Sequence, residues 1–406
     1  MASSSESPAR RAEVVAKSRP LSSLWQLDAN IAHLNHGSFG AVPLDVQLVQ
    51  ESFQKRMNTN PNRWFRSELP DLMVGARHIT ASWLGVDAGD FAFVPNAGQG
   101  VITAVQSLVN HVKAQHHTAH LVDTSLGYGG VTRGLQHVAS RSGATYVDAL
   151  LTYPVDLDAS VIAGRIREHL RQAEAPTIVV LDHITSETGL LLPVAEVISD
   201  IRTTHPGTLF VIDGAHSAGM LQRPIPDGCD VWVGNLHKWL CAPRPAAGLV
   251  CRNPKLRAAL APLAPSWGFE DGFPASFDWQ GTADYSSYLS VPAAITFQEQ
   301  WSWSLRDDHN RSVVDAGAEL LRRAWKVDPH VESSREAPWM RMVKTPSSRP
   351  LAKAELDATI ERAGRELKAE CVLMSVGNST YVRLSAHMYN EVDDYKALIG
   401  LTSLLP

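Results

Sequence analysis

The stretch VWVGNLHKWLCAP, residues 231–243, places a lysine where an apolar strand ends. Its first residues are β-branched, aromatic or small, which is typical of a buried strand, and Asn235, His237 and Lys238 follow. Lysine is rarely buried without a partner, so Lys238 needs a chemical reason. A desolvated lysine amine can act as a nucleophile and form a Schiff base with an aldehyde. A surface lysine beside a polar His237 is an equally good interpretation of this stretch alone.

A second strand ends in an acid. The stretch LFVIDGAHSAG, residues 209–219, carries Asp213 at the end of an apolar run and His216 just beyond it. A carboxylate at the carboxyl end of a parallel strand lies where open α/β sheets bind ligands. There it can pair with a protonated pyridine nitrogen, which keeps such a ring an electron sink. A metal-binding or helix-capping aspartate is the alternative.

Two further turns follow apolar strands. In FVPNAGQGVITAV, residues 93–105, the small residues of a turn precede a helix, so backbone N–H groups and the helix dipole could hold a phosphate. This turn matches neither a Walker loop nor a dinucleotide fingerprint. In LDHITSETG, residues 181–189, Asp182, His183 and Ser186 lie at another strand end, where an ordinary connection is the alternative.

Around these stretches, short apolar runs alternate with amphipathic ones from about residue 90. The alternation is typical of helices packed on a mostly parallel sheet. It predicts an α/β large domain with a seven-stranded, mainly parallel sheet. The predicted strands are 91–95, 120–124, 144–151, 177–184, 209–215, 231–236 and 246–251, and the predicted helices are 100–112, 131–143, 159–173 and 193–205.

The pattern changes after about residue 290, where a smaller C-terminal α+β domain is predicted over 291–406. The large domain then covers 21–290, its N-terminal segment contributing to the small domain and the active site, and residues 1–20 form a flexible tail. The predicted elements of the small domain are helices at 293–306, 312–326 and 351–368, strands at 339–344, 370–376 and 379–386, and a final helix.

Composition favours a small-molecule partner. The formal charge is −5 and the charges are of mixed sign, so there is no basic stripe for nucleic acid and no polybasic segment for a membrane surface. No stretch is apolar for long enough to span a bilayer. The 4 cysteines show no CxxC spacing, which indicates reduced thiols and a cytoplasmic location. No metal is expected, because His111, His116, His117 and His120 fall in a stretch predicted to be a solvated surface loop.

The order of these pieces resembles that of fold-type I pyridoxal-phosphate (PLP) enzymes of the class V aminotransferase group. Within the group the chain is most similar to the isopenicillin N epimerase-like branch, from about residue 25 to the C-terminus. The matching stretches are LNHGSFGAVP (34–43), NRWFRSELP (62–70), DHITSETGLLLPV (182–194), DGAHSAG (213–219), GNLHKWLCAP (234–243), WQGTADYSSYLSVPAAI (279–295) and YVRLSAHMYN (381–390).

The resemblance implies roles at the cofactor pyridoxal 5'-phosphate. Lys238 would hold the cofactor as a Schiff base and carry the proton at Cα, and Asp213 would pair with the pyridine nitrogen. Tyr128, in SLGYGG, would stack on the ring face, and His216 would approach the phenolic oxygen. The other implied cofactor-binding residues are Ala97, Gly98 and Gln99 of the turn at 93–105, together with Ser186 and His237.

The resemblance also implies a homodimer with shared active sites, because Thr282 in QGTAD would reach a phosphate in the partner subunit. Arg383, in YVRLSAH, would grip the substrate α-carboxylate by a bidentate pair. Loop structure and surface charge are equally good explanations for the residues predicted to face the distal part of the substrate, which are Asn35, His36, Gly37, Arg63 and Arg66.

The chain departs from the family pattern on the expected substrate side. Glu187 stands where the family usually has a proline, and Arg244-Pro245 stands in a segment where it usually has a glycine. These departures predict a specificity that differs from that of the epimerases.

The motifs do not fix the reaction, because cofactor-binding residues serve epimerisation, C–S cleavage, decarboxylation and transamination alike. Cys371 lies in the apolar run 370–376 and is predicted to be a core residue, which argues against a cysteine desulfurase. Resemblance to epimerase-like members of sulfur-containing natural-product pathways, lincosamide antibiotics included, favours β-elimination or decarboxylation of an S-substituted cysteine. An epimerase and a PLP-binding protein without turnover are the alternatives.

Overall fold

The computed structural model describes residues 21–153, 157–170, 176–329 and 335–406, so the predicted tail at 1–20 lies outside the described residues. The chain divides into a large unit, Gln50–Pro292, and a small unit, Met1–Val49 with Ala293–Pro406. The boundary falls within helix α3 (Leu44–Thr59), and the residues before it group with the C-terminal part of the chain.

The large unit contains a seven-stranded sheet in the order β2-β8-β7-β6-β5-β3-β4. Strand β8 runs antiparallel to both of its neighbours, and the other strands are parallel to one another, so the predicted mainly parallel α/β sheet is confirmed. The strands are β2 (Phe91–Val94), β3 (His120–Thr124), β4 (Thr145–Ala149), β5 (Thr177–Asp182), β6 (Leu209–Asp213), β7 (Val231–Asn235) and β8 (Ala247–Val250).

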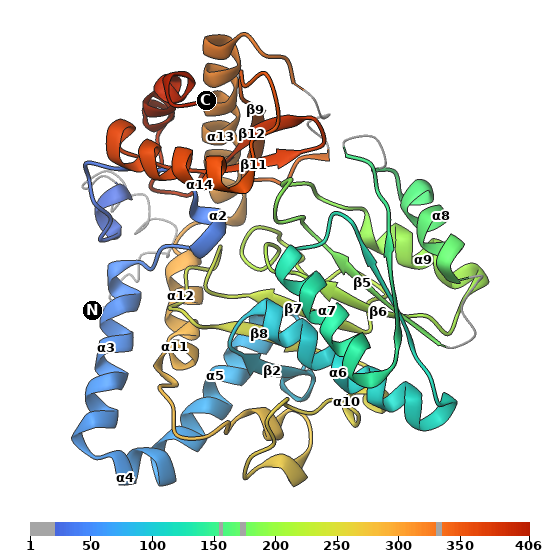
Figure 1. The fold of residues 1–406 in the computed structure, drawn as a ribbon. Coiled ribbons are helices and arrows are strands. Elements are labelled where there is room, and N and C mark those ends of the chain that lie inside the picture. Colours follow the sequence, from blue (N-terminus) through green and yellow to red (C-terminus); the bar gives the residue numbers. More distant parts are fainter. Residues whose placement is uncertain (1–20, 154–156, 171–175, 330–334) are drawn as a thin grey trace. The chain divides into compact units, whose positions relative to one another are not determined.

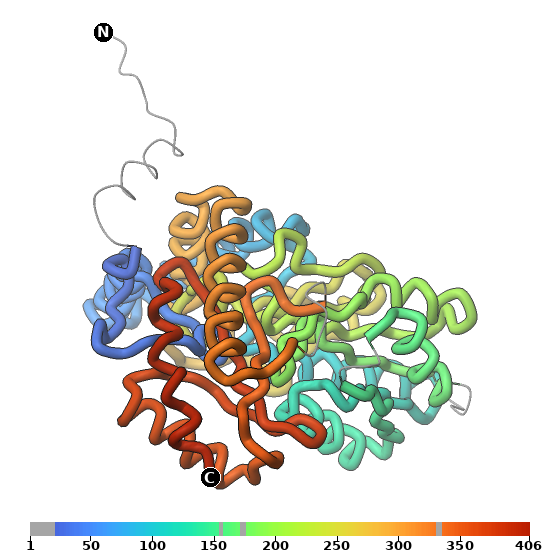
Figure 2. Tube along the Cα trace, turned by 90° about the horizontal axis from the view of Figure 1, so that it is seen from above, coloured from blue at the N-terminus to red at the C-terminus, as the bar shows by residue number. Residues whose placement is uncertain are grey.

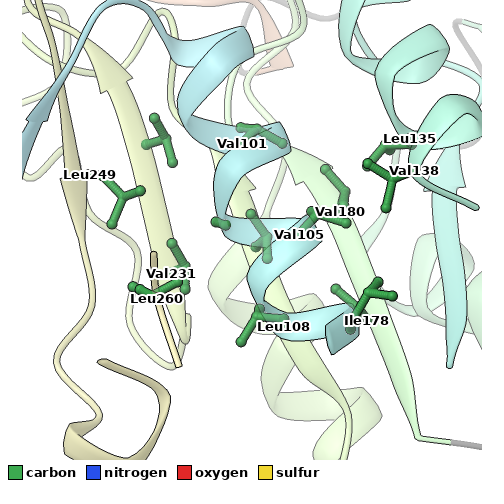
Figure 3. Close-up of a cluster of buried hydrophobic side chains, with 14 of the residues drawn as sticks. Val101, Val105, Leu108, Leu135, Val138, Ile178, Val180, Val231, Leu249 and Leu260 are labelled. Carbon is green, nitrogen blue, oxygen red and sulfur yellow. The ribbon is translucent and has the colours of Figure 1, made fainter. Parts of the chain in front are cut away.

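Helices cover both faces of this sheet (Figure 1). On one face, α6 (Ala97–His116) and α7 (Gly129–Ser142) pack on alternate strand residues such as Ile178 and Val180 (Figure 3). On the other face, Arg202 of α9 (Val194–Thr204) lies over the ring of Phe210 in β6, and α8 (Ala159–Leu170) packs beside α9. Successive side chains of each strand point to opposite faces of the sheet, so strands covered by helices on both faces are apolar throughout. Polar side chains are therefore found at the strand ends.

Strand register brings acidic side chains together at the carboxyl edge of the sheet. Asp182 of β5 is the register partner of Asp213 of β6. Asp123 is the last residue but one of β3, which neighbours β5 in the sheet. Parallel strands end at the same edge, so the loops that follow β3, β5, β6 and β7 converge on it.

The segment before β2 was not predicted from the sequence and is helical. It consists of α3, the short α4 (Pro61–Arg63), a π-helical turn (Trp64–Glu68) and α5 (Leu69–Leu84). Other short elements of the large unit are 3-10 turns at Ala88–Asp90, Phe269–Asp271 and Ala275–Phe277 and the helices α10 (Pro254–Arg257) and α11 (Ser286–Leu289).

The small unit is built on a three-stranded antiparallel sheet, β11-β12-β9, and on a parallel pair formed by β1 and β10. Because β1 comes from residues 32–33 and pairs with residues 369–370, the N-terminal segment belongs to this unit. The strands are β1 (Ala32–His33), β9 (Met340–Lys344), β10 (Ala369–Glu370), β11 (Val372–Val376) and β12 (Ser379–Ser385), and the first helices are a 3-10 turn (Leu21–Leu24) and α2 (His36–Phe39).

Two helix predictions in this unit need correction. The helix predicted at 293–306 is α12 (Val291–Gln298), and α13 (Trp303–Trp325) begins earlier than predicted, because Ser302 accepts the N–H of Leu305 and caps it. The final helix is a 3-10 segment, Val392–Ser403, that lies along α13 (Figures 1 and 2). The remaining elements are α14 (Lys353–Arg362) and a π-helical turn at Ala363–Leu367.

Gly317 explains the close approach of α13 and the final segment. A Cβ at this position would lie 2.4 Å from the ring of Tyr395, so only glycine leaves room for the ring. Among the helices of the described residues, none is both long and apolar enough to cross a membrane.

Candidate active site

Lys238 follows β7 at the carboxyl edge of the large sheet. Its Nζ lies 3.1 Å from Nε2 of His216, which comes from the turn after β6. The chain leaves β7 in a fixed direction, because the N–H groups of Leu236 and His237 both donate to the carbonyl of Ala246. The backbone thus presents Lys238 to the turn that carries His216.

Three aspartates lie buried at the same edge. Burial raises the pKa of Asp213 to about 6, against the N–H of Ala215 and the charge of Lys238, which both lower it. Burial also raises the pKa of Asp123 to about 6. For Asp182, burial followed by repulsion from Asp213 and Asp123 raises the pKa well above its usual range. The edge therefore concentrates three buried acid groups, none of which takes part in an ion pair among the described residues.

The donor set around Asp213 fits a protonated pyridine ring. Asp213 is almost fully buried, and its Oδ1 accepts the N–H of Ala215 over 2.9 Å. Among the ion pairs of the described residues, none includes Asp213, although burial of an unpaired carboxylate is costly. A pyridinium N–H would supply the missing cationic donor. This fit, with Lys238 close by, is what the predicted cofactor requires.

The predicted phosphate turn forms the start of α6. Asn96 caps the helix by accepting the N–H of Gln99, and Oδ1 of Asn235 accepts the N–H of Ala97 over 2.8 Å. Two of the three predicted N–H groups thus donate to side chains, and the N–H of Gly98 takes part in neither bond. The positive end of a 20-residue helix dipole remains a favourable site for a phosphate.

The loop that carries Tyr128 rests on the buried aspartates. Asp182 accepts backbone N–H groups from Tyr128 and Ser186, so it ties together the loops after β3 and β5. A Cβ on Gly127 would lie 2.8 Å from Oδ1 of Asp123, and a Cβ on Gly130 would lie 2.7 Å from the Tyr128 ring. Tyr128 is 48% exposed, and the missing side chains of both glycines leave room for this loop.

His237, predicted to bind the phosphate, is nearly buried, and its Nδ1 lies 2.7 Å from the carbonyl of Ala246. Burial lowers the pKa of His237 to about 4, so the imidazole is neutral near pH 7. With the proton on Nδ1, Nε2 offers a lone pair rather than an N–H. A bound phosphate would favour the imidazolium form, so its role at the phosphate stays a prediction.

Three other predicted residues of the large unit are exposed. Thr282 lies in an exposed turn before α11. Arg63 is exposed and its Nε lies 3.0 Å from Glu68, and Arg66 is exposed on the π-helical turn. These residues face solvent in the isolated chain, and their roles also stay predictions.

The small unit brings several predicted substrate residues together. Arg383 of β12 is buried and its Nη2 donates to Asn35 over 3.2 Å and to Ser38 over 2.9 Å. The N–H of Gly37 donates to Ser385, which lies on the same strand. Asn35 and Arg383 are 348 residues apart in the sequence, yet the turn at 35–37 and the arginine form one cluster.

Aromatic side chains surround His36 in this cluster. Its Nδ1 lies 3.0 Å from the hydroxyl of Tyr389, and its ring stacks on His387 with centroids 4.3 Å apart. Trp25 packs edge-on against both His387 and Tyr389. Sequence reasoning missed Ser38, Trp25, His387 and Tyr389, although the last two lie within the matching stretch at 381–390.

Raised thiol pKa values argue against a nucleophilic role for Cys229, Cys251 and Cys371. All four are free thiols, and Cys241, Cys251 and Cys371 are buried. Burial raises the pKa of Cys371 and of Cys229 to about 12 and that of Cys251 to about 11. Cys371 lies between β10 and β11 rather than within one strand, and it belongs to the core of the small unit as predicted.

Comparison with protein families gives one match, to Aminotransferase class-V, over residues 41–398. Pyridoxal 5'-phosphate is accordingly the cofactor that the family and the geometry at Lys238 and Asp213 indicate.

Several curated proteins are similar in sequence. A probable chloroplastic L-cysteine desulfhydrase of Arabidopsis thaliana is 26% identical over 399 residues, 91% of this chain and 82% of its own length. A putative L-cysteine desulfhydrase 1 of Oryza sativa subsp. japonica is 29% identical over 73% of this chain, and the match spans only 64% of the rice protein. An isopenicillin N epimerase of Streptomyces clavuligerus is 26% identical over 73% of this chain and 76% of its own length.

Solved structures share the fold. The cystine C–S lyase C-DES, in complex with its reaction product cysteine persulfide, superposes with a TM-score of 0.74 and 19% identity over 93% of this chain and 99% of that chain. A NifS-like protein superposes with a TM-score of 0.72 and 15% identity over 92% and 99% of the two chains. These likenesses show the fold alone.

Proposed function

This chain belongs to the class-V aminotransferase family, and from that premise we propose that it is a PLP-dependent lyase that cleaves the C–S bond of cysteine or of an S-substituted cysteine by β-elimination. The observation that carries the proposal is the distance of 3.1 Å between Nζ of Lys238 and Nε2 of His216, beside the buried Asp213, whose pKa burial raises. A nucleophilic amine and a carboxylate suited to a pyridinium meet at one strand edge.

The proposed reaction is balanced without an external oxidant. An S-substituted cysteine and water give a thiol, pyruvate and ammonia, and with cysteine itself the thiol is hydrogen sulfide. Bound PLP supplies an electron sink for the charge that develops at Cα. The amine of Lys238 would hold the cofactor and take the proton from Cα, and Asp213 would pair with the ring nitrogen.

The cysteines favour elimination over sulfur transfer to the enzyme. A desulfurase of the transfer type needs a thiolate that can reach the substrate sulfur. Here burial raises the pKa values of Cys229, Cys251 and Cys371, and Cys241 is fully buried. Release of the sulfur into solution requires none of these thiols.

Substrate recognition is proposed to rest on Arg383. Its guanidinium donates to the oxygens of Asn35 and Ser38, which orient it, and guanidinium geometry suits a bidentate pair with a carboxylate. L-cysteine desulfhydrases among the relatives support cysteine as a substrate. Glu187, exposed after β5, supports a substrate other than that of the epimerases. S-substituted cysteines of natural-product pathways are the finer part of the proposal.

The test is a substrate panel. We expect purified, PLP-loaded protein to convert L-cysteine and S-substituted cysteines to pyruvate, ammonia and the thiol in equal amounts. The variant Lys238→Ala serves as the control and should form no product. Carbon dioxide with an aldehyde would assign decarboxylation instead. An unchanged cofactor spectrum with every amino acid would identify a PLP-binding protein without turnover, and either result would overturn the lyase.

Epimerisation is the second candidate, because isopenicillin N epimerases of two organisms are 26% and 27% identical to this chain. An epimerase would exchange the Cα hydrogen with D₂O and invert the amino acid without forming pyruvate. Chiral chromatography of the recovered substrate therefore separates the two functions.

A homodimer with shared sites is also proposed. The exposed Thr282, in the turn before α11, supports donation of a side chain to a partner's phosphate. One chain has a mass of 44.3 kDa, and light scattering should give twice this value. Mixing inactive Lys238→Ala chains with Thr282→Val chains should restore part of the activity if sites are shared, and no restoration would contradict sharing.

A further inference from the structure

Trp239 follows Lys238 in the chain and contacts the same histidine. Its indole Nε1 donates to Nδ1 of His216 over 3.2 Å, and Nε2 of His216 lies 3.1 Å from Nζ of Lys238. The rings of Trp239 and His216 are both fully buried. The imidazole therefore bridges the indole and the lysine, with one nitrogen toward each.

The indole contact decides where the proton of His216 lies. An indole N–H can only donate, so Nδ1 of His216 must offer a lone pair. A neutral imidazole carries one proton, which is then on Nε2. An imidazolium would set an N–H of His216 against the indole N–H, so the same contact disfavours the charged form.

The position of that proton bears on Lys238. The Nε2–H of His216 points at Nζ, and an ammonium has three donors and no acceptor. We propose that Trp239 is a positioning residue: it fixes His216 as the Nε2–H tautomer, which donates to Nζ and favours the unprotonated, nucleophilic form of Lys238. The proposal rests on the proposed role of Lys238 as the cofactor lysine.

Charged neighbours oppose this effect. The carboxylate of Asp213 on β6 attracts an ammonium at Lys238, Asp182 on β5 adds to the acidic surroundings, and His237 on the Lys238 side is neutral. Removing the indole N–H would free His216 to take the Nδ1–H tautomer, in which Nε2 accepts a hydrogen bond from the ammonium of Lys238. The ammonium would then prevail, and only the amine adds to an aldehyde.

Nitrogen NMR of the cofactor-free protein tests the tautomer directly. With ¹⁵N-histidine labelling, and His216→Gln to assign the signals, wild type should show the pattern of a neutral, Nε2-protonated ring. Trp239→Phe should lose that single pattern. Trp232→Phe is the matched control, because Trp232 is equally buried and donates to Ser217 over 3.2 Å. It should leave His216 unchanged.

Cofactor uptake gives a second readout. The rate at which PLP becomes fixed to the cofactor-free protein, trapped with borohydride, should fall about fivefold in Trp239→Phe, as expected for one lost hydrogen bond, and stay within about twofold of wild type in Trp232→Phe. An Nδ1-protonated or doubly protonated His216 in wild type would overturn the proposal. So would a Trp239→Phe variant with unchanged tautomer and uptake.

The outcomes remain separable from those of the proposed function. A protein that fails to cleave cysteine would still show the tautomer of His216, since the spectrum is recorded without cofactor or substrate. If Trp239→Phe does not fold, the wild-type spectrum alone decides between the two tautomers.

Discussion

The two edges of the seven-stranded sheet treat buried acid groups differently. At the amino edge, Asp230 before β7 pairs with Arg202 over 2.8 Å, and Asp90 before β2 pairs with Arg257. At the carboxyl edge, Asp123, Asp182 and Asp213 take no part in the ion pairs of the described residues and accept hydrogen bonds from neutral donors.

The presence of ion pairs at one edge and their absence among the described residues of the other indicate which edge binds a ligand. Arginines of the chain itself compensate the acids at the amino edge, which makes that edge structural. Burial raises the pKa of Asp213 at the carboxyl edge because no full counter-charge is present. A cationic ring bound there would complete the site. Burial also raises the pKa of Asp230 at the amino edge, so the missing ion pair, rather than the raised pKa, distinguishes the carboxyl edge.

The largest expected effect separates the two edges by activity. Asp213→Asn should lower kcat about 100- to 1000-fold, because a neutral amide cannot hold the ring nitrogen protonated. Asp230→Asn, at the amino edge, should change kcat less than about twofold while costing about 1 kcal/mol of stability through the loss of its pair with Arg202. Steady-state kinetics and thermal unfolding of both variants make the comparison. Equal losses of kcat would break it.

A similar contrast exists between two buried arginines of the small unit. Arg383 is bonded to neutral Asn35 and Ser38, whereas Arg341 pairs with Asp315 over 2.7 Å. Arg383→Lys should raise KM about 10- to 100-fold, because the bidentate fork to a carboxylate is lost. Arg341→Lys should lower the unfolding temperature and leave KM unchanged. An unchanged KM in Arg383→Lys would remove it from the substrate site.

Stability against pH sharpens the comparison further. Since the folded-state pKa of Asp213 is raised to about 6, its ionisation is harder in the folded chain than in the unfolded one. Stability is therefore lost as the pH rises from about 4 to about 6, and stays lost above. In the cofactor-free protein, Asp213→Asn should gain up to about 3 kcal/mol at pH 7 and almost nothing at pH 4.

Thermal unfolding at both pH values measures this gain. Between pH 4 and pH 7, PLP-loaded wild type should lose less stability than cofactor-free wild type, because the ring supplies the counter-charge of Asp213. If Asp213→Asn raised the stability equally at both pH values, ionisation of Asp213 would not be what destabilises the cofactor-free protein.

The smallest effect concerns two glycines. Gly130→Ala would bring a Cβ within 2.7 Å of the Tyr128 ring, and Gly207→Ala, before β6 at the amino edge, meets nothing within 4 Å. Gly130→Ala should weaken PLP binding about threefold to tenfold, as for the loss of one stacking contact. Gly207→Ala should leave it unchanged. Fluorescence titration with PLP compares the two, and equal affinities would argue against stacking by Tyr128.

The sequence predicted the sheet well because its strands are short apolar runs with a buried face on each side, such as 177–184 and 209–215. It did not indicate α3 and α5, and it joined α12 to α13 across Gln298 and Trp303. Apolar and aromatic residues continue through that break, so only the cap at Ser302 marks it.

The site could be predicted only in part. The strand ends at Asp213 and Lys238 are visible as local patterns, and the roles of Tyr128 and Arg383 came from resemblance. Contacts such as Trp239 to His216 depend on where two loops meet, and no periodicity in the sequence encodes them. The same holds for Ser38 beside Arg383, which lies 345 residues away.

The most direct test of the account is to reduce the PLP-loaded protein with borohydride and map the modified peptide by mass spectrometry. We predict one phosphopyridoxyl group per chain, attached to Lys238, and none in the Lys238→Ala variant. Attachment to another lysine, or a wild-type chain that takes up no PLP, would contradict it.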